Sequence, residues 1–500
     1  MVEWITQVNN TLNGIVWGWP ALILLAFVGV LTSCITRFFQ ISHLGHWMKH
    51  TIGAIFHDSE VTSHTADRSI SQFQSLCTAL AATVGTGNIV GVAGAILVGG
   101  PGAVFWMWLI AFFGMMTNYS ENVLGIFYRR KNELGEWSGG AMYYLRDGLG
   151  AKKGCKTVGK VLAAAFSVFC FLASFGIGNM TQVNSISGNV YSVFGVPTWA
   201  TGIVILILCG LVIVGGLKRI ATVTEKIVPF MVLIYMVGTI AILVKNFAMI
   251  PAVFTAIFEG AFALKAAGGG IVGYGIKLAI EQGMKRGVFS NEAGLGSSVM
   301  VHSNSNVREP VRQGMWGIFE VFADTMVVCT LTAFTVLSSG LVDLDTGIAV
   351  TEYAGVELTK ANLVSTVFTM NFGWLGGAFV AIAIVLFAYS TVLGWSHYGS
   401  KACEYLFGAK ATKVYRIVFV LATFGGAVMG ENLAWDIADT LNGMMMIPNL
   451  IGVTVLSPVV YQITKNYVAR KILGKSEEPI LSSFPDIQAE AEAAVLNGAE

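Results

Sequence analysis

The chain has 500 residues, of which 55% are hydrophobic and only 12% are charged, and its formal net charge is +1. Soluble proteins carry roughly 25% charged residues, and the mean hydropathy here is +0.69. These values exclude an ordinary soluble domain and predict a polytopic membrane protein. A net charge this close to zero says nothing about partners, so the positions of the charges carry the information.

Runs of about 20 apolar residues are long enough to cross a bilayer as helices. Eleven such runs occur, and they predict an all-α membrane protein with about eleven transmembrane helices. Several runs exceed a simple span, which indicates tilted, kinked or broken helices. The predicted spans are residues 16–37, 73–97, 101–128, 159–190, 197–216, 223–245, 252–284, 312–339, 367–400, 413–429 and 432–463.

The basic residues predict how the chain is oriented in the membrane, because Lys and Arg accumulate in cytoplasmic loops. Nearly all of the 30 Lys and Arg residues fall in alternate loops if the loop after the first span is cytoplasmic. The acidic loop of residues 343–357 then lies outside. This pattern predicts an N-out, C-in topology.

Two segments differ from the spans in composition. Residues 39–72 begin after a basic turn and are less apolar. They are predicted to form an amphipathic segment at the cytoplasmic membrane surface. Residues 467–500 are predicted to be a cytoplasmic tail, whose polar and acidic last part, 476–500, is expected to be disordered.

The most informative stretch is residues 79–91, which lies inside a predicted span but carries two Thr, one Asn and three Gly residues. Glycine is the residue that a helix tolerates worst after proline. Unwound backbone at membrane depth persists only where it lines a cavity or meets a ligand, as in the broken helices of secondary transporters. We therefore predict a ligand-binding break at residues 85–88, where N–H groups could hold a carboxylate. Close helix packing through Gly87 and Gly91 is the alternative.

A second glycine-rich stretch, residues 268–275, has five Gly residues in eight positions. A matching pair of interrupted spans in the two halves of a transporter indicates a binding site at the membrane midplane. The pattern thus predicts a second break in this stretch. The alternative is a glycine-rich extracellular loop.

Polar side chains within two other spans are further candidates. Ser390 and Thr391 are adjacent and could offer two hydroxyl ligands to a small cation, although such hydroxyls more often bond back to their own helical turn. Trp395 follows one turn later and could cap a pocket or simply pack. An earlier span carries a polar set whose partners could be a substrate or a neighbouring helix: Asn179, Gln182, Asn184 and Ser185.

The sequence lacks the motifs of the common energy-coupling and hydrolytic enzymes. No Walker A, HExxH or DFG-like pattern occurs in it. We therefore expect no enzyme activity, no organic cofactor and no nucleic-acid partner. Transport, if that is the function, would be driven by an ion gradient.

One long motif resembles a known family. Residues 99–114, GGPGAVFWMWLIAFFG, closely resemble the signature of the alanine/glycine:cation symporter family, and the FWMW run is specific. Residues 82–88 (ATVGTGN) and 289–296 (FSNEAGLG) are similar to that family too. The similarity runs from about residue 14 to residue 470.

The resemblance implies a fold, a function and a location. The implied function is sodium-coupled, sometimes proton-coupled, uptake of alanine or glycine across a prokaryotic plasma membrane. The implied fold is LeuT-like, with two inverted five-helix repeats preceded by one extra helix. The implied domains are residues 1–38 (the extra helix), 39–72 (the interfacial segment), 73–246 (the first repeat), 247–466 (the second repeat) and 467–500 (the tail).

On this mapping the breaks and the polar residues form one site for a small neutral amino acid and Na⁺, with membrane lipid around it. Alternatives left open are H⁺ coupling, another substrate such as glutamine or serine, and a channel. The expected substrate-binding residues are Thr83, Thr86, Gly87, Asn88, Gln182, Gly270, Gly273 and Trp395. The expected Na⁺ ligands are carbonyls near Ala82 and Gly85 and the hydroxyls of Ser390 and Thr391.

Overall fold

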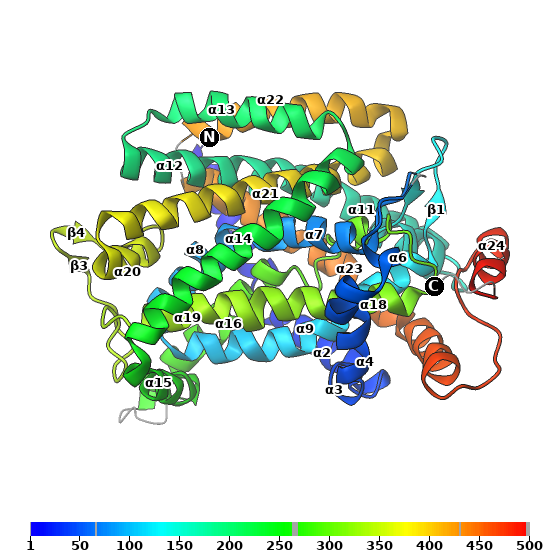
Figure 1. Ribbon diagram of the computed structural model, residues 1–500, viewed down its shortest axis with the longest axis horizontal. Helices are drawn as coiled ribbons and strands as arrows, with labels where there is room; N and C mark the ends of the chain where they lie inside the picture. Colours follow the sequence, from blue (N-terminus) through cyan, green and yellow to red (C-terminus); the bar gives the residue numbers. More distant parts are fainter. Residues whose placement is uncertain (1, 66–67, 263–268, 430–431, 497–500) are drawn as a thin grey trace.

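The computed structural model describes residues 2–65, 68–262, 269–429 and 432–496. Long helices run side by side along the longest axis, and only short strands accompany them (Figure 1). Among the described residues, eight helices are long and apolar enough to cross a membrane, and one bent pair makes a possible ninth. The protein is therefore a helical, multi-pass membrane protein, and the number eleven stays a prediction.

The helices of the first half follow in chain order, with η marking a 3-10 or π turn. They are α1 (Val2–Val16), α2 (Trp19–Ile35), α3 (Phe39–Ser42), α4 (Leu44–Met48), η1 (Lys49–Gly53), α5 (Ala54–His57), α6 (Ser59–Thr62), α7 (Gln72–Thr83), η2 (Thr86–Asn88), α8 (Val90–Gly99), α9 (Gly102–Phe127), α10 (Ala141–Tyr143), η3 (Tyr144–Leu149), α11 (Lys156–Phe175), η4 (Gly176–Met180), α12 (Thr181–Phe194), α13 (Thr198–Ile213) and α14 (Leu217–Lys245).

The helices of the second half are η5 (Phe247–Met249), α15 (Ile250–Phe262), α16 (Gly269–Asn291), α17 (Val299–His302), α18 (Pro310–Val321), η6 (Phe322–Cys329), α19 (Thr330–Leu337), α20 (Leu363–Phe372), α21 (Trp374–Phe407), η7 (Ala409–Ala411), α22 (Thr412–Val428), α23 (Asn432–Tyr467), η8 (Val468–Ile472) and α24 (Pro485–Leu496). Two antiparallel hairpins pair β1 (Arg130–Lys131) with β2 (Trp137–Ser138) and β3 (Glu352–Tyr353) with β4 (Val356–Glu357).

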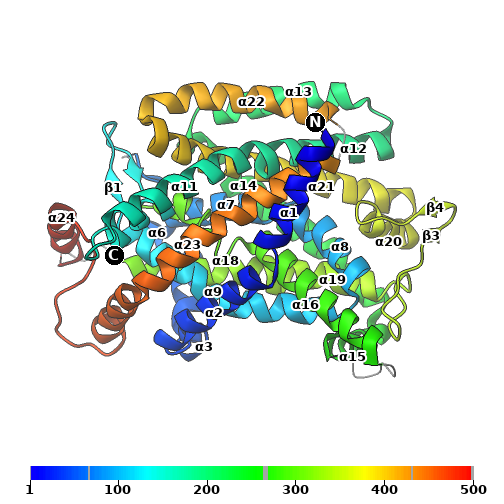
Figure 2. The ribbon, with the colours of Figure 1, turned by 180° about the vertical axis from the view of Figure 1, so that it is seen from behind.

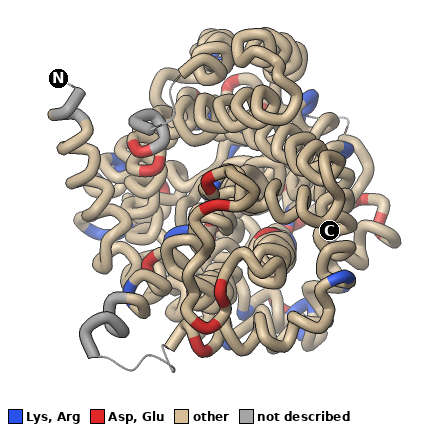
Figure 3. The backbone as a smooth tube through the Cα atoms, turned by 90° about the vertical axis from the view of Figure 1, so that its left-hand side faces the viewer, with Lys and Arg blue, Asp and Glu red and all other residues tan. Residues whose placement is uncertain are grey.

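The hairpins mark the two ends of the long axis. The β1 hairpin and α24 lie at one end, whereas β3, β4 and α20 lie at the other (Figures 1 and 2). Asp and Glu residues are prominent on the end with β3 and β4 (Figure 3). The acidic loop is thus far from the basic β1 strand along the axis.

The first predicted break is confirmed. Helix α7 starts at a capping box, in which Ser71 Oγ accepts from Gln74 N (3.1 Å) and Gln74 Oε1 accepts from Ser71 N (3.2 Å). It ends at Thr83, and the chain resumes with η2 and α8 at an angle of 58°. Helix propensity is lost where Gly85 and Gly87 flank Thr86, which is why the break falls there.

The second predicted break, at residues 268–275, is wrong for the portion that the structure describes. Helix α16 is continuous from Gly269 to Asn291, and Gly268 lies outside the described residues. Each glycine costs a helix about 1 kcal/mol, but unwinding in lipid would leave several backbone groups without partners. The chain instead leaves the helical path at residues 292–298, where Glu292 (φ 57°) and Gly294 (φ 90°) are left-handed.

The predicted span 252–284 contains most of α15 and most of α16, and residues 263–268 between them lie outside the described residues. One further expectation needs correction. The tail expected to be disordered carries α24, and it docks on the protein: Ser483 N donates to Phe127 O (3.0 Å) and Lys131 pairs with Glu490 (3.3 Å). The tail therefore has a docking partner that composition alone does not reveal.

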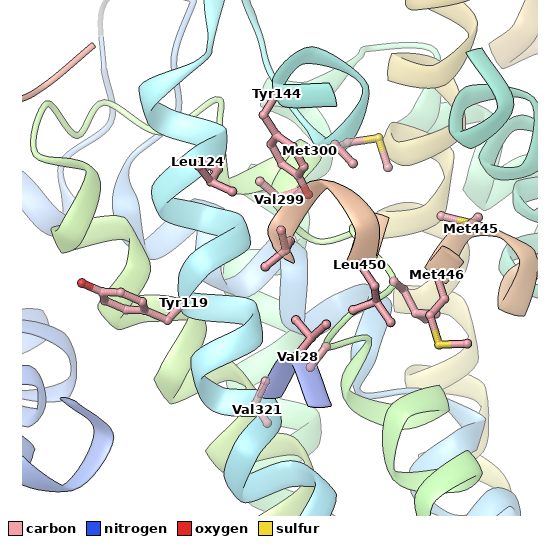
Figure 4. Packing of buried hydrophobic residues seen from close by; sticks show 14 of the residues in the cluster. Val28, Tyr119, Leu124, Tyr144, Val299, Met300, Val321, Met445, Met446 and Leu450 are labelled. Carbon is pink, nitrogen blue, oxygen red and sulfur yellow. The ribbon is translucent and has the colours of Figure 1, made fainter. Parts of the chain in front are cut away.

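A buried core holds the two halves of the chain together around α9. Val28 of α2, Leu124 of α9, Val299 of α17 and Leu450 of α23 all lie in it and are fully buried or nearly so (Figure 4). A hydrogen bond also crosses this core, in which Asn449 Nδ2 of α23 donates to Glu121 Oε1 of α9 (2.5 Å). This packing fixes α16 and α17 against α9 and so positions the second unwound segment.

Candidate functional site

The two unwound segments meet at a small cavity in the middle of the helices. Its volume is about 20 Å³, which is enough for a water molecule or a small cation. Five segments build it: the first break, η4 with the start of α12, the end of α16 with the unwound segment after it, the middle of α21, and α23. The described residues that line it are Ala82, Thr83, Gly85, Thr86, Gly87, Ile177, Gln182, Phe289, Glu292, Thr391, Trp395 and Asn442.

Asn88 holds the first break open rather than lining the cavity. Its Oδ1 accepts from the backbone N–H of Gly85 (2.9 Å), and its Nδ2 donates to Asp324 Oδ1 (2.6 Å). Asn88 and Asp324 are both fully buried. A side chain thus supplies the partners that the lost helical turn no longer provides, as the low-dielectric surroundings require.

Thr86 and Gln182, both predicted to bind substrate, meet at the cavity wall. Thr86 Oγ1 donates to Gln182 Oε1 (3.0 Å), and Gln182 Nε2 donates to Ile177 O (3.0 Å). The pair joins the first break to α12. Thr83, also predicted, lines the cavity and donates to Ala79 O (3.3 Å).

The expected cation ligands are only partly brought together. A Cβ on Gly85 would clash with Thr391 Oγ1, so the glycine lets the break touch α21. Thr391 lines the cavity, whereas the fully buried Ser390 hydroxyl contacts Met231 Sδ (3.4 Å) on α14. Both hydroxyls donate to Phe387 O (2.9 Å).

Trp395 forms one wall, and glycine makes room for it. A Cβ on Gly178 would overlap the Trp395 side chain, so η4 and α21 approach closely at this point. Gly394, the residue before Trp395, makes room for Ala82 of α7, because a Cβ there would lie 2.8 Å from Ala82 Cβ. The indole is held edge-on against Tyr398, with 5.3 Å between ring centroids.

Gly270 and Gly273, predicted to bind substrate, lie too far along α16 to reach this cavity. A continuous helix rises 1.5 Å per residue, which puts them roughly 24–28 Å from Phe289. The cavity residues that α16 and the unwound segment after it do supply are Phe289 and Glu292. Glu292 is buried, and its Oε2 accepts from Ser297 Oγ (2.5 Å).

Sequence reasoning missed Phe289, Glu292, Ile177 and Asn442 as lining residues. A signal for two of them was present, because residues 289–296 carry the family-like FSNEAGLG stretch with two glycines. Gly294 and Gly296 have φ of 90° and 73°, values that L side chains rarely adopt. Ile177 and Asn442 left no signal, since an apolar residue and an amide are ordinary within a helix.

A larger vestibule of about 410 Å³ adjoins the cavity. Thr86, Gly87, Ile177 and Phe289 line both spaces and therefore form the partition between them. The vestibule also reaches the loop before α20 and the first turns of α23, through Asn362 and Asp436. The vestibule thus lies between the cavity and the end that carries β3 and β4.

A helical membrane protein with a cavity where two unwound segments meet belongs to the class of membrane transporters. The sequence profile of the sodium:alanine symporter family matches residues 2–481, and the chain belongs to that family. The sodium/alanine symporter AgcS of Methanococcus maripaludis is 45% identical over 92% of this chain and 96% of its own length.

Another relative is named for a different substrate. The probable sodium/glutamine symporter GlnT of Bacillus subtilis is 34% identical over 95% of this chain and 93% of its own length. Among solved structures, MhsT in complex with L-phenylalanine matches with a TM-score of 0.50 and 13% identity, over 80% of this chain and 99% of that one. At this identity the likeness concerns the fold alone.

Asn88→Ala should destabilise the protein, because it leaves the Gly85 N–H without its partner and removes the donor to Asp324 Oδ1. An unsatisfied buried polar group costs about 1–3 kcal/mol. We expect a lower midpoint of thermal unfolding in detergent. The matched control is Asn371→Ala, whose Nδ2 bonds only to Val367 O of its own helix (2.9 Å). Equal midpoints for the two variants would contradict the role given to Asn88.

Proposed function

We propose that this protein imports a small neutral amino acid, alanine or glycine, together with Na⁺ across a prokaryotic plasma membrane. One observation carries the proposal: the Gly85–Gly87 backbone, Thr391 and two aromatic side chains surround one cavity between two unwound segments. Freed carbonyls and a hydroxyl suit Na⁺, and N–H groups suit a carboxylate. Membership of a sodium:alanine symporter family supports this reading.

The wider organisation follows the same proposal. Residues 73–246 and 247–466 would be the two inverted repeats, with residues 1–38 as an extra helix, 39–72 as an interfacial segment and 467–500 as a tail. On this division the first repeat begins with a helix that is interrupted at the cavity, α7–α8, and the second repeat contains another, α16–α17, after α15. The chain ends lie toward opposite ends of the long axis, in keeping with an N-out, C-in topology (Figures 1 and 2).

The sizes of the cavity and of the vestibule constrain how alanine would enter. About 20 Å³ holds a cation but no amino acid, whereas the adjoining vestibule has about 410 Å³. Phe289 belongs to the partition between them, so its movement would join the two spaces. Alanine would then lie against Thr86 and Gly87 with its methyl group facing Phe289 and Trp395.

Competition of labelled alanine uptake by all twenty amino acids, with and without Na⁺, tests the proposal in proteoliposomes. Alanine and glycine should compete, and uptake should vanish when the Na⁺ gradient is abolished. Glutamine is the second candidate, since one relative is named as a probable sodium/glutamine symporter. Uptake that needs only a proton gradient would overturn Na⁺ coupling, and gradient-independent flux would indicate a channel.

Gly87→Leu should abolish alanine binding. A Cβ at this position would lie 3.5 Å from Phe289 Cδ1, so a leucine side chain would fill the space where the ligand meets the backbone. Binding of labelled alanine to the purified, folded variant measures the effect. Gly210→Leu on α13 is the control, because its Cβ would lie at a similar distance, 3.6 Å, from Val420 Cγ1 and away from the cavity. Normal alanine affinity in the Gly87 variant would rule out this placement.

Removing both hydroxyls in a Ser390→Ala, Thr391→Ala protein should weaken Na⁺ activation more than alanine binding at saturating Na⁺. Loss of one good ligand raises the half-activating Na⁺ concentration about tenfold, which is about 1.4 kcal/mol. Thr391→Ala alone should account for most of the shift, since Ser390 faces Met231. Ser396→Ala is the control on the same helix, because its hydroxyl bonds to Leu393 O (2.6 Å). A wild-type Na⁺ activation curve in the double variant would show the assignment to be wrong.

Trp395→Ala should change which side chains are accepted. The wild type should reject leucine and phenylalanine by overlap with the walls, whereas a missing methyl costs only about 1–3 kcal/mol, so glycine and alanine both bind. Opening this wall should admit longer side chains or end binding. Trp395→Phe keeps a ring against Gly178 and serves as the milder variant. Leucine competing as well as alanine in the wild type, or an unchanged profile in Trp395→Ala, would refute the assignment.

A further inference from the structure

Several helix ends meet at a pocket of about 230 Å³ that lies apart from the transport cavity. The turn between α13 and α14 and the turn between α21 and α22 form its walls, together with the β1 hairpin. None of its described lining residues belongs to the central cavity or to the vestibule. Because α14, α21 and α22 are long and apolar enough to cross a membrane, the pocket lies where their ends leave it.

The pocket has an excess of positive charge. The Lys, Arg and Glu residues that line it are Arg68, Glu136, Lys218, Lys401, Glu404 and Arg416. Both carboxylates already have a basic partner, since Arg68 lies 3.7 Å from Glu136 and Lys401 lies 3.0 Å from Glu404. Lys218 and Arg416 are therefore left without a counter-charge among the residues that line this pocket.

Arg416 presents an accessible guanidinium to the pocket. The side chain is only half-buried, and no acceptor bonds to it within the part of the chain that the structure describes. A Cβ on Gly216 would lie 3.0 Å from Arg416 Nη1, so the guanidinium lies directly against this glycine. Gly216 is the N-cap of α14 and has a φ of 76°. The cation is thus placed at the start of a long helix.

The start of α14 carries charges that are unfavourable for a helix in isolation. Its N-cap supplies no side-chain acceptor, and its first turn holds Lys218 and Arg219 but no acidic residue. A helix N-terminus is partially positive, so cations there are unfavourable and anions are favoured. Arg219 turns away to donate to Leu211 O (2.9 Å). Lys218 Nζ donates to Thr65 O (3.1 Å), which leaves two of its three donors for a ligand.

Exposed apolar side chains lie beside the pocket on α13 and α22, which run side by side as an outer layer of the protein (Figures 1 and 2). Leu211 and Val214 at the end of α13 are 62% and 59% exposed, and Val414 and Ile417 at the start of α22 are 65% and 56% exposed. In a membrane such side chains contact acyl chains. Cations in a pocket next to an apolar face match the two parts of a phospholipid.

We propose that this pocket binds the phosphate of an anionic phospholipid, whose acyl chains lie on the exposed face of α13 and α22. The Arg416 guanidinium holds the phosphate, Lys218 adds a second positive charge, and the start of α14 adds backbone N–H groups. Basic pockets between transmembrane helices bind such headgroups. A zwitterionic lipid is disfavoured because its choline group would enter a positively charged pocket. The lipid ties the α13–α14 turn to α22 and stabilises this layer.

The test measures the midpoint of thermal unfolding of the full-length protein in dioleoyl phosphatidylcholine nanodiscs, with and without dioleoyl phosphatidylglycerol. Phosphatidylglycerol should raise the midpoint of the wild type, and Arg416→Gln should lose most of this rise. Each basic side chain near a membrane surface changes lipid affinity about fivefold, so Arg416→Gln with Lys218→Gln should weaken phosphatidylglycerol binding about 25-fold. Native mass spectrometry of the protein titrated with this lipid measures that affinity.

Phosphatidylcholine alone separates lipid binding from a structural role of Arg416. There Arg416→Gln should unfold at the wild-type midpoint or above it, because a cation beside a helix N-terminus has been removed. Lys413→Gln is the matched control, since Lys413 is an exposed cation on the same helix and does not line the pocket. It should keep the full rise with phosphatidylglycerol. Arg416→Lys retains the charge and should keep part of the rise.

Four results would overturn the lipid site. Two concern Arg416→Gln: an undiminished rise with phosphatidylglycerol, and a lower midpoint than the wild type in phosphatidylcholine alone. The third is an equal loss in Lys413→Gln, which would indicate general surface charge. The fourth is an equal rise with inorganic phosphate at constant ionic strength, which would indicate a site for a free anion. These measurements involve neither alanine nor Na⁺, so they stand or fall separately from the proposed transport function.

Discussion

The constraint on which this structure depends is that backbone polar groups inside a membrane must find partners within the protein. The protein breaks two helices at its centre and so creates groups that need partners. At the first break, Asn88 accepts a hydrogen bond from the Gly85 N–H, and its amide group donates another to Asp324. At the second break Asn291 Oδ1 accepts from the Ala293 N–H (3.0 Å) and Ser297 donates to Glu292. The unwound segments are thus held by specific side chains, and the transport cavity is the space that remains between them.

Close approach of helices is the second requirement, and glycine meets it at three places around the cavity. Gly85 admits Thr391, Gly178 admits Trp395 and Gly394 admits Ala82. None of these glycines has a positive φ, so each is needed for the space that a Cβ would occupy, and Gly85 in addition lies in the unwound segment. Glycine therefore has two separate uses in this chain, and only one of them unwinds a helix.

That distinction explains how far the sequence could predict the fold. The helical membrane class and the break at residues 85–88 followed from composition and from polar residues next to glycines, and both are confirmed. The break expected at residues 268–275 is wrong because glycine content alone was taken as the signal. From Gly269 on the helix is continuous, since in lipid an unwound turn costs more than poor helix propensity. The real break carries Asn291, Glu292 and Ser297, side chains that can replace the lost backbone partners, and this polar content is the better signal.

Only some of the residues of the candidate site could be predicted from the sequence. Thr86, Gln182, Thr391 and Trp395 were found because polar or bulky residues inside apolar spans stand out, and the structure places them around one cavity. Asn88 was assigned to the ligand, but its hydrogen bonds show it serving the backbone, a difference that depends on Asp324 236 positions further along the chain. Ile177 could not be found, because an apolar residue within a helix carries no mark of facing a cavity. Thr86, Gly87, Ile177 and Phe289 separate the inner cavity from the vestibule, and only the folded arrangement reveals that these residues from different segments lie together.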